Sequence, residues 1–265
     1  MNSAERQLAA LVNHRHATLT PRGNAAIFFS LFIAKKMGKK KVLIPDQGGW
    51  LTFRTYPTVL GMDMELLKTN DGVIDPQTIS LSPDTVLLYA QPAGYFAEQD
   101  MKAIYERCKS MLVIADVSGS VGSELCHGGY ADILLGSFSE WKPLNIGYGG
   151  FVSVKEKEMV DYGKEIVTIN KVHPTLEKEV EARLKTCTQR YHDLFAKAEK
   201  TKRDLAEYDI IHREKKGINV VIAYKNEKQK DDLISYCKKQ QLEYTLCPRF
   251  IRVMRPAISI EIKRT

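Results

Sequence analysis

Short apolar runs alternate with amphipathic segments over the first 155 residues of the chain. Apolar residues recur at helical spacing in residues 1–16, 25–37 and 98–110, and a helix-like segment begins near Trp50. The apolar runs have the length and composition of buried strands. They lie at residues 41–45, 62–67, 85–90, 111–115, 133–137 and 150–154. Alternation of this kind predicts a mostly parallel sheet with helices on both faces, a three-layer α/β/α fold.

The pattern changes after residue 155. Residues 155–208 are rich in Lys, Glu, Leu and Ala at helical spacing. Strand-like runs at 217–224 and 258–262 then flank a helix at 228–240. We therefore expect a large α/β domain followed by long helices and a small α+β domain. The two predicted domains are residues 1–155 and 156–265.

Composition places few limits on this picture. The 265 residues are 44% hydrophobic and 27% charged, with a net charge of +7, which suits one sizeable core and a smaller one. A basic protein could bind nucleic acid. The basic residues are scattered, however, and no nucleic-acid-binding motif accompanies them, so a solvated basic face is favoured over a nucleic-acid partner.

Cysteine usage and hydropathy predict a cytoplasmic protein with reduced thiols. The five cysteines are odd in number and form no CxxC pair, which argues against a disulfide framework or a zinc site. HExxH, dinucleotide-binding and P-loop motifs are also absent from the sequence, so we expect no metal. Neither a secretory signal nor an apolar stretch of membrane-spanning length is evident.

Three features of the first half are arranged in an order that suggests chemistry. Gly23 lies in a turn before a helix, Asp116 ends an apolar strand, and Lys142 lies in a loop that leads to Gly149 and Gly150. Singly, these residues are most simply a turn glycine, a helix cap and a surface amine. Together they place a carboxylate where open α/β sheets bind ligands, and an amine that burial would deprotonate. Downstream glycines would let the backbone pass close to a ligand.

At these positions the chain resembles the DegT/StrS-type sugar aminotransferases, a family of the fold-type-I pyridoxal-5'-phosphate (PLP) enzymes of the aspartate aminotransferase superfamily. The resemblance covers about residues 18–155. Its most specific part is the spacing of Ser137, Lys142 and the double glycine. The other matching segments are Gly23-Asn24-Ala25-Ala26, Val42-Leu43-Ile44-Pro45, Asp75-Pro76, Gln91-Pro92, Ile114-Ala115-Asp116 and Ala131-Asp132-Ile133.

The resemblance implies PLP transferase fold type I and assigns the two catalytic residues. Lys142 matches the lysine that forms a Schiff base with the cofactor. Asp116 matches the carboxylate beside the pyridine nitrogen, which keeps the ring protonated so that it accepts electrons.

Five residues match the family's cofactor-binding positions. Gly23, Asn24 and Ala25 match the turn that caps the phosphate, in agreement with the anion preference of a helix N-terminus. Ser137 matches a phosphate ligand. Trp50 would stack on the cofactor ring, and a tryptophan of the buried core is the alternative.

Some positions depart from the family pattern. Gly119 stands where the family often has a Gln or His that contacts the cofactor, Pro143 follows the lysine in place of Asn, and Tyr148 precedes the double glycine in place of Glu. The chain is also shorter than typical members, in the substrate-facing C-terminal part.

Two C-terminal arginines are candidate substrate ligands. Arg252 and Arg255 lie where many fold-type-I transaminases place an arginine that binds a substrate carboxylate. A basic strand edge is the simpler interpretation.

The predicted function is that of a PLP-dependent aminotransferase. By resemblance it would use an amino donor and a carbonyl acceptor, either a keto-sugar nucleotide or another small carbonyl compound, and would act as a homodimer. One alternative is a different fold-type-I reaction, such as that of a lyase or of a desulfurase, which needs a loop thiol; Cys126 is the one candidate. Another is a catalytically degenerate relative that serves as a binding or regulatory protein.

Overall fold

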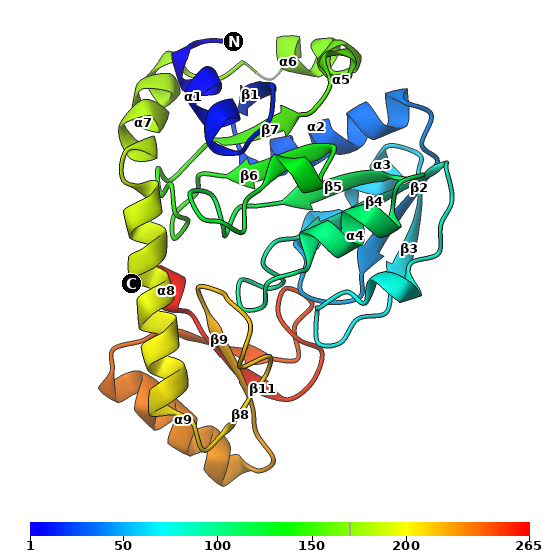
Figure 1. Ribbon diagram of the computed structural model, residues 1–265. Helices are drawn as coiled ribbons and strands as arrows, with labels where there is room; N and C mark the ends of the chain where they lie inside the picture. Colours follow the sequence, from blue (N-terminus) through cyan, green and yellow to red (C-terminus); the bar gives the residue numbers. More distant parts are fainter. Residues whose placement is uncertain (170) are drawn as a thin grey trace.

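The computed structural model describes residues 1–169 and 171–265, and this part of the chain contains two sheets (Figure 1). The larger sheet has seven strands in the order β1-β7-β6-β5-β4-β2-β3. Strands β2 to β6 pair in parallel, whereas β7 runs antiparallel to both of its neighbours. The strands are β1 (His16–Thr20), β2 (Lys41–Pro45), β3 (Asp63–Leu67), β4 (Thr85–Ala90), β5 (Leu112–Asp116), β6 (Ile133–Ser137) and β7 (Gly150–Val154).

Helices cover both faces of the larger sheet, which explains its apolar strands. In β5, Val113 packs in the core on one face and Ile114 in the core on the other, because successive side chains of a strand point to opposite faces. The first core includes residues of α1 (Ser3–Leu11), α4 (Met101–Arg107) and α7 (Pro174–Leu184), and the second includes residues of α2 (Gly23–Lys36), α5 (Lys157–Tyr162) and α6 (Lys164–Ile169). The result is a three-layer arrangement.

The smaller sheet is antiparallel, in the order β10-β11-β9-β8. Its core joins Ile222 and Ile258 of the sheet to Ala198 and Leu233 of two helices. These elements are β8 (Asp209–Ile210), β9 (Val220–Ala223), β10 (Tyr244–Cys247), β11 (Ala257–Ile260), α8 (Cys187–Asp204) and α9 (Glu227–Lys239). Helix α8 runs along one side of the molecule, from α7 beside the larger sheet to the smaller sheet (Figure 1).

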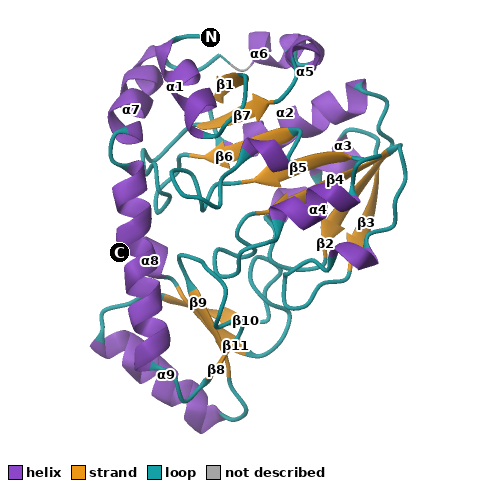
Figure 2. Cartoon of the chain, viewed as in Figure 1, coloured by secondary structure: helices purple, strands orange, loops and turns teal. Residues whose placement is uncertain are grey.

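The small sheet and the loops next to it pack against the loops that follow the large sheet's strands (Figure 2). Three backbone hydrogen bonds join them: Gly48 N to Phe250 O (2.7 Å), and Ile218 N and Asn219 N to Tyr95 O (2.8 and 3.0 Å). The loops that follow β2 and β4 are therefore joined to the C-terminal part of the chain.

The predicted fold class, a mostly parallel three-layer fold with a small α+β C-terminal part, is confirmed. The division at residue 155 stays a prediction, because independent folding of the two parts is a separate property. The predicted helical region 155–208 includes residue 170, which lies outside the described residues.

Several short elements differ from the expectations. Strands β1, β8 and β10 were not predicted, and the segment near Trp50 forms two short helices rather than one long one. The predicted helix 98–110 is shortened to α4, since the Asp100 side chain accepts a hydrogen bond from Ala103 N and caps it there. The remaining short elements are η1 (Leu51–Phe53), α3 (Tyr56–Val59), η2 (Pro76–Thr78), η3 (Gly128–Tyr130) and η4 (Ile262–Arg264). Of the helices in residues 1–169 and 171–265, none combines the length and apolar character that a membrane span requires.

Candidate active site

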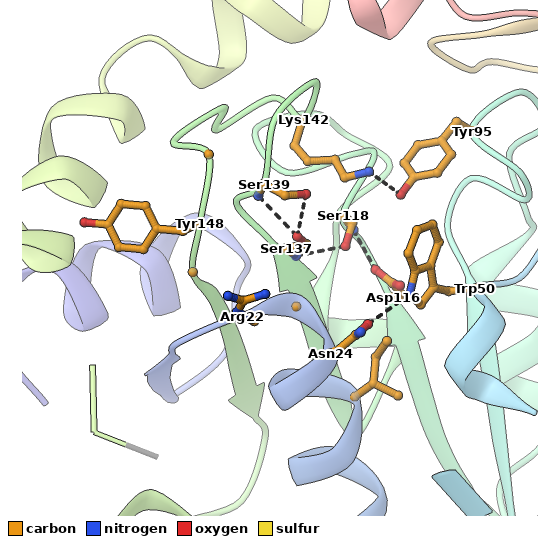
Figure 3. A pocket seen from close by; sticks show the side chains of 14 residues that line it. Arg22, Asn24, Trp50, Tyr95, Asp116, Ser118, Ser137, Ser139, Lys142 and Tyr148 are labelled. Atoms are coloured by element: carbon orange, nitrogen blue, oxygen red, sulfur yellow. Dashed lines mark hydrogen bonds between the residues drawn. The ribbon is translucent and has the colours of Figure 1, made fainter. Parts of the chain in front are cut away.

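A cavity of about 300 Å³ lies where the carboxyl ends of β5 and β6 meet the first turn of α2 (Figure 3). This is the edge of a parallel sheet at which α/β proteins bind ligands. The lining residues are Arg22, Gly23, Asn24, Ile27, Trp50, Tyr95, Asp116, Ser118, Ser137, Ser139, Lys142, Gly147, Tyr148 and Gly149.

Lys142 is a buried amine in the wall of this cavity. It lies in the loop between β6 and β7, its side chain is 7% exposed, and Nζ donates a hydrogen bond of 2.6 Å to the hydroxyl of Tyr95. Burial lowers the pKa of Lys142 to about 8; the charge of Asp116 opposes the decrease and that of Arg252 adds to it. An appreciable fraction of the amine is thus unprotonated near neutral pH, as a nucleophile requires.

Asp116 is a buried carboxylate in the same cavity, at the end of β5. It is 8% exposed, and Oδ1 accepts a hydrogen bond of 2.9 Å from the backbone N–H of Ser118. Burial raises the pKa of Asp116 above its usual range, although the Ser118 contacts and Lys142 partly offset this effect. Among the ion pairs of the described residues none includes Asp116, so a cationic ligand would relieve the cost of its burial.

The first turn of α2 lies against the end of β6. Arg22 is the N-cap residue and provides no side-chain hydrogen bond to the helix. A Cβ at position 23 would lie 2.5 Å from Cβ of Ser137, so only glycine allows this approach. Ser137 in turn donates a hydrogen bond of 2.9 Å to the hydroxyl of Ser139. The hydroxyls and the helix N-terminus together form a site suited to an anion.

Trp50 lies at the edge of the cavity rather than in the core. It is 36% exposed, and its Nε1 donates a hydrogen bond of 2.9 Å to Oδ1 of Asn24 (Figure 3). The interpretation of Trp50 as a buried core residue is therefore wrong. Its ring is free to contact a ligand.

The structure brings together most of the predicted site residues and leaves three outside. Gly23, Asn24, Trp50, Asp116, Ser137 and Lys142 all line the cavity. Ala25, in the first turn of α2, is not among the lining residues. Whether any of them binds a cofactor stays a prediction.

Both candidate arginines form ion pairs with acidic residues that do not line the cavity. Arg252 is 2% exposed and forms a bidentate pair with the fully buried Glu261, at 2.9 Å from Nε to Oε1 and 2.6 Å from Nη2 to Oε2. Arg255 pairs with Asp71, at 2.7 Å between Nη2 and Oδ2. Neither arginine lines the cavity, so a role for them in substrate binding also stays a prediction.

Sequence reasoning missed five lining residues with polar side chains. Arg22, Ser118 and Ser139 adjoin residues that were predicted, and their position beside Gly23, Asp116 and Ser137 was a usable signal. Tyr148 was noted only as a departure from the family pattern; its hydroxyl lies 3.1 Å from that of Thr175. Tyr95 gave no signal, because it is 47 residues from its partner Lys142.

The cysteines do not supply a reactive loop thiol. All five are buried, and Cys126 does not line the cavity. Burial raises the pKa of the Cys126 thiol, which makes a thiolate less accessible.

Solved structures with the same fold include several enzymes. NtdA from Bacillus subtilis, solved with the bound cofactor PMP, is 16% identical, with a TM-score of 0.75 over 97% of this chain and 71% of that chain. Helicobacter pylori PseC, an aminotransferase involved in the biosynthesis of pseudoaminic acid, is 14% identical, with a TM-score of 0.75 over 97% and 84%. Serine palmitoyltransferase from Sphingomonas wittichii is 11% identical, with a TM-score of 0.74 over 97% and 69%.

These likenesses define the class of fold: the chain has the mostly parallel α/β architecture of PLP transferases, as the sequence predicted. Residues 188–265 also match the model of the MJ1341 family C-terminal domain. No curated protein matches the sequence. The family match covers only the C-terminal part, so membership of the DegT/StrS family stays a prediction.

Proposed function

We propose that this chain is a PLP-dependent aminotransferase. The observation that carries the proposal is the pairing, in one cavity, of a buried lysine whose pKa is lowered to about 8 with a buried carboxylate that has no ion-pair partner among the described residues. Buried groups with strongly perturbed pKa values, gathered in a cleft, are typical of active sites.

The residues present fit the proposed cofactor. When bound, PLP supplies an aldehyde that reacts with amines and a pyridine ring that accepts electrons. Lys142 would hold it covalently, and Asp116 would stabilise the protonated ring nitrogen. The phosphate would be held by the first turn of α2 together with Ser137, and Trp50 would contact the ring.

Residues of the chain itself would transfer the proton, stay charged opposite the cofactor and exclude water. Nζ of Lys142 would act as the base that takes a proton from the substrate carbon and as the acid that returns one. Asp116 stays ionised when a positive charge faces it, because the attraction offsets the free-energy cost of burying the carboxylate. The covering loops and the C-terminal part limit the access of water to this site.

The proposed acceptor is a keto-sugar nucleotide or another small carbonyl compound. The resemblance of residues 18–155 supports a sugar, and PseC is named as an aminotransferase of pseudoaminic acid biosynthesis. Arg22 is exposed at the cavity and has no ion-pair partner among the described residues, which suits an anionic substrate group.

A different reaction with the same cofactor is the second candidate, because a serine palmitoyltransferase shares the fold. A desulfurase reaction is not favoured, because Cys126, the candidate thiol, is buried and does not line the cavity. Product analysis separates the remaining reactions: an aminotransferase converts the donor amino acid to a 2-oxo acid only when an acceptor takes the amino group.

The experiment that tests the proposal is the absorbance spectrum of the purified protein after incubation with PLP. We expect a visible band that borohydride abolishes, with the cofactor then attached to the peptide that contains Lys142. The Lys142→Ala variant should lose the band, because the covalent bond is to Nζ.

A second buried lysine provides the control. Lys202 is 6% exposed and lies in α8, outside the cavity, so Lys202→Ala should keep the band. A band that survives in Lys142→Ala would move the covalent bond to another lysine. A protein that stays colourless with PLP but retains polyanions would support the degenerate binding protein instead.

A further inference from the structure

The hydroxyl of Tyr95 is the group in direct contact with the amine of Lys142. Within residues 1–169 and 171–265, the bond of 2.6 Å to Tyr95 is the one hydrogen bond of Nζ, and no ion pair includes this lysine. The ammonium also lies 4.2 Å from the centre of the Tyr95 ring. Figure 3 shows the amine pointing toward this hydroxyl across the cavity. Tyr95 therefore fixes where Nζ lies.

The position of the Tyr95 ring depends on its own backbone and on the space beside Gly119. Its backbone has a φ of 70°, and its carbonyl accepts hydrogen bonds from both Ile218 and Asn219. A Cβ at position 119 would lie 2.7 Å from Cδ1 of Tyr95. The Tyr95 ring can therefore occupy this wall of the cavity only because Gly119 has no side chain. A φ of this sign is costly for tyrosine and persists only where the surroundings impose it.

The electrostatic surroundings of Tyr95 keep its hydroxyl neutral. Burial, and next the charge of Asp116, raises the pKa of Tyr95 above its usual range. A neutral hydroxyl can accept a hydrogen bond from an ammonium and can donate one to a free amine. It can therefore hold Nζ in either protonation state, whereas a phenyl ring offers no hydroxyl for this bond.

Two basic side chains from the C-terminal part lie near the same ring. Nζ of Lys263 lies 4.3 Å from the ring centre and Cζ of Arg252 lies 5.4 Å from it. Burial, followed by the charges of Lys142 and Arg252, lowers the pKa of Lys263 to about 6. The charged side chains that act on the Tyr95–Lys142 pair are Asp116, Arg252, Glu261, Lys263 and Arg264.

We propose that Tyr95 is a positioning residue, whose hydroxyl, 2.6 Å from Nζ of Lys142, holds this amine in the cavity. The inference rests on the proposed function, in which Lys142 carries the cofactor. Hydrogen bonds to a charged donor are about twice as strong as neutral ones. Loss of the hydroxyl therefore destabilises the ammonium form of Lys142 more than the amine form, and lowers the pH at which Lys142 is deprotonated.

The test measures Lys142 in the protein without added cofactor. Acetic anhydride acetylates an amine only in its unprotonated form, so the extent of acetylation at Lys142, followed by mass spectrometry over pH 6–10, gives the midpoint of deprotonation. In the wild type the reactive amine fraction should rise with pH, with a midpoint near 8. In Tyr95→Phe the midpoint should fall by about one pH unit, a tenfold change in the ammonium–amine equilibrium.

A second tyrosine offers a matched control. The hydroxyl of Tyr89 is buried without a hydrogen-bond partner, and its side chain packs in the core that contains α1 and α4. Tyr89→Phe is the same chemical change outside the cavity, and it should leave the Lys142 midpoint unchanged. Gly119→Ala is a further variant, because the added Cβ displaces the ring while the hydroxyl remains; its midpoint should also fall.

Capture of PLP separates this inference from the proposed function. In Tyr95→Phe the covalent capture of PLP should be at least about tenfold slower than in the wild type at a pH above both midpoints, because Nζ has lost its orientation. Equal midpoints and equal capture rates in the wild type and the folded Tyr95→Phe and Gly119→Ala variants would overturn the role of Tyr95. Failure of the wild type to capture PLP would instead overturn the proposed function, whatever the midpoints are.

Discussion

Glycine 23 shows how much of this site depends on the absence of one side chain. The first turn of α2 can approach β6 only because Gly23 has no Cβ, and the atom it would meet belongs to Ser137 at the end of a strand. Ser137 pairs with Gly150 of β7, and its backbone N–H donates a hydrogen bond to the hydroxyl of Ser118, so this strand end has little freedom to move. The same contact places the helix N-terminus beside a hydroxyl that lines the cavity.

We expect Gly23→Ala to lower the free energy of unfolding by about 1–3 kcal/mol, the usual cost of added volume in a packed site. Urea unfolding measures this change, and titration with PLP should show weaker binding in the same variant. Because the clash is with a side chain, the double variant Gly23→Ala/Ser137→Gly should recover much of the stability. Purely additive losses in the double variant would show that the two residues do not interact.

At the level of elements, a buried ion pair holds the C-terminal segment in place. Arg252 follows β10 and Glu261 follows β11, and the pair is nearly inaccessible to water. Burial alone would raise the pKa of Glu261; the charge and hydrogen bonds of Arg252, with Lys263, outweigh it and hold the pKa at about 2. The loop that carries Arg252 is thus tied to the segment that surrounds Tyr95.

Arg252→Met should therefore lower the free energy of unfolding at neutral pH by about 3–5 kcal/mol, because it leaves Glu261 buried without its main partner. Urea unfolding at neutral pH measures the loss. In the double variant Arg252→Met/Glu261→Met the loss should be much smaller. Unchanged stability together with weaker binding of the amino donor would instead favour the substrate role predicted for Arg252 from the sequence.

At the level of the whole molecule, the open side of the cavity carries exposed aromatic and apolar side chains. Trp50 and Tyr148 line the cavity and are 36% and 38% exposed, and Leu51 beside Trp50 is 58% exposed. Exposed apolar residues around a binding site are typical of protein–protein interfaces. The resemblance to fold-type-I enzymes implies a homodimer whose subunits complete each other's sites.

We accordingly expect sedimentation velocity at micromolar concentration to give twice the chain mass of 30.0 kDa. Leu51→Glu places a charge on this surface and should shift the protein toward the monomer. The substitution is at an exposed position, so the far-UV circular dichroism spectrum should not change. A wild-type protein that sediments as a monomer would remove the homodimer from the proposal.

The sequence determined the parallel core of the molecule and two groups of its site. Strands β2, β4 and β6 begin and end where their apolar runs do, because burial on both faces leaves an unbroken apolar signal. Strand β1, which has half-buried residues at alternate positions, and the two-residue β8 leave no such signal. Asp116 stood out because a polar group at the end of an apolar run is a local pattern, and Lys142 because its spacing from Ser137 and from Gly149-Gly150 resembles a family pattern.

Only the tertiary structure decided which distant side chains meet. Local periodicity shows which residues are buried, but it does not encode the order of the strands or the way in which the loops fold over their ends. Tyr95 and the basic side chains of the C-terminal part reach Lys142 through that arrangement alone, and the pairing of Arg252 with Glu261 in the interior also depends on it. The sequence indicated the amine of Lys142, whereas the groups that affect its position and its proton affinity could be recognised only from the packing of the two sheets.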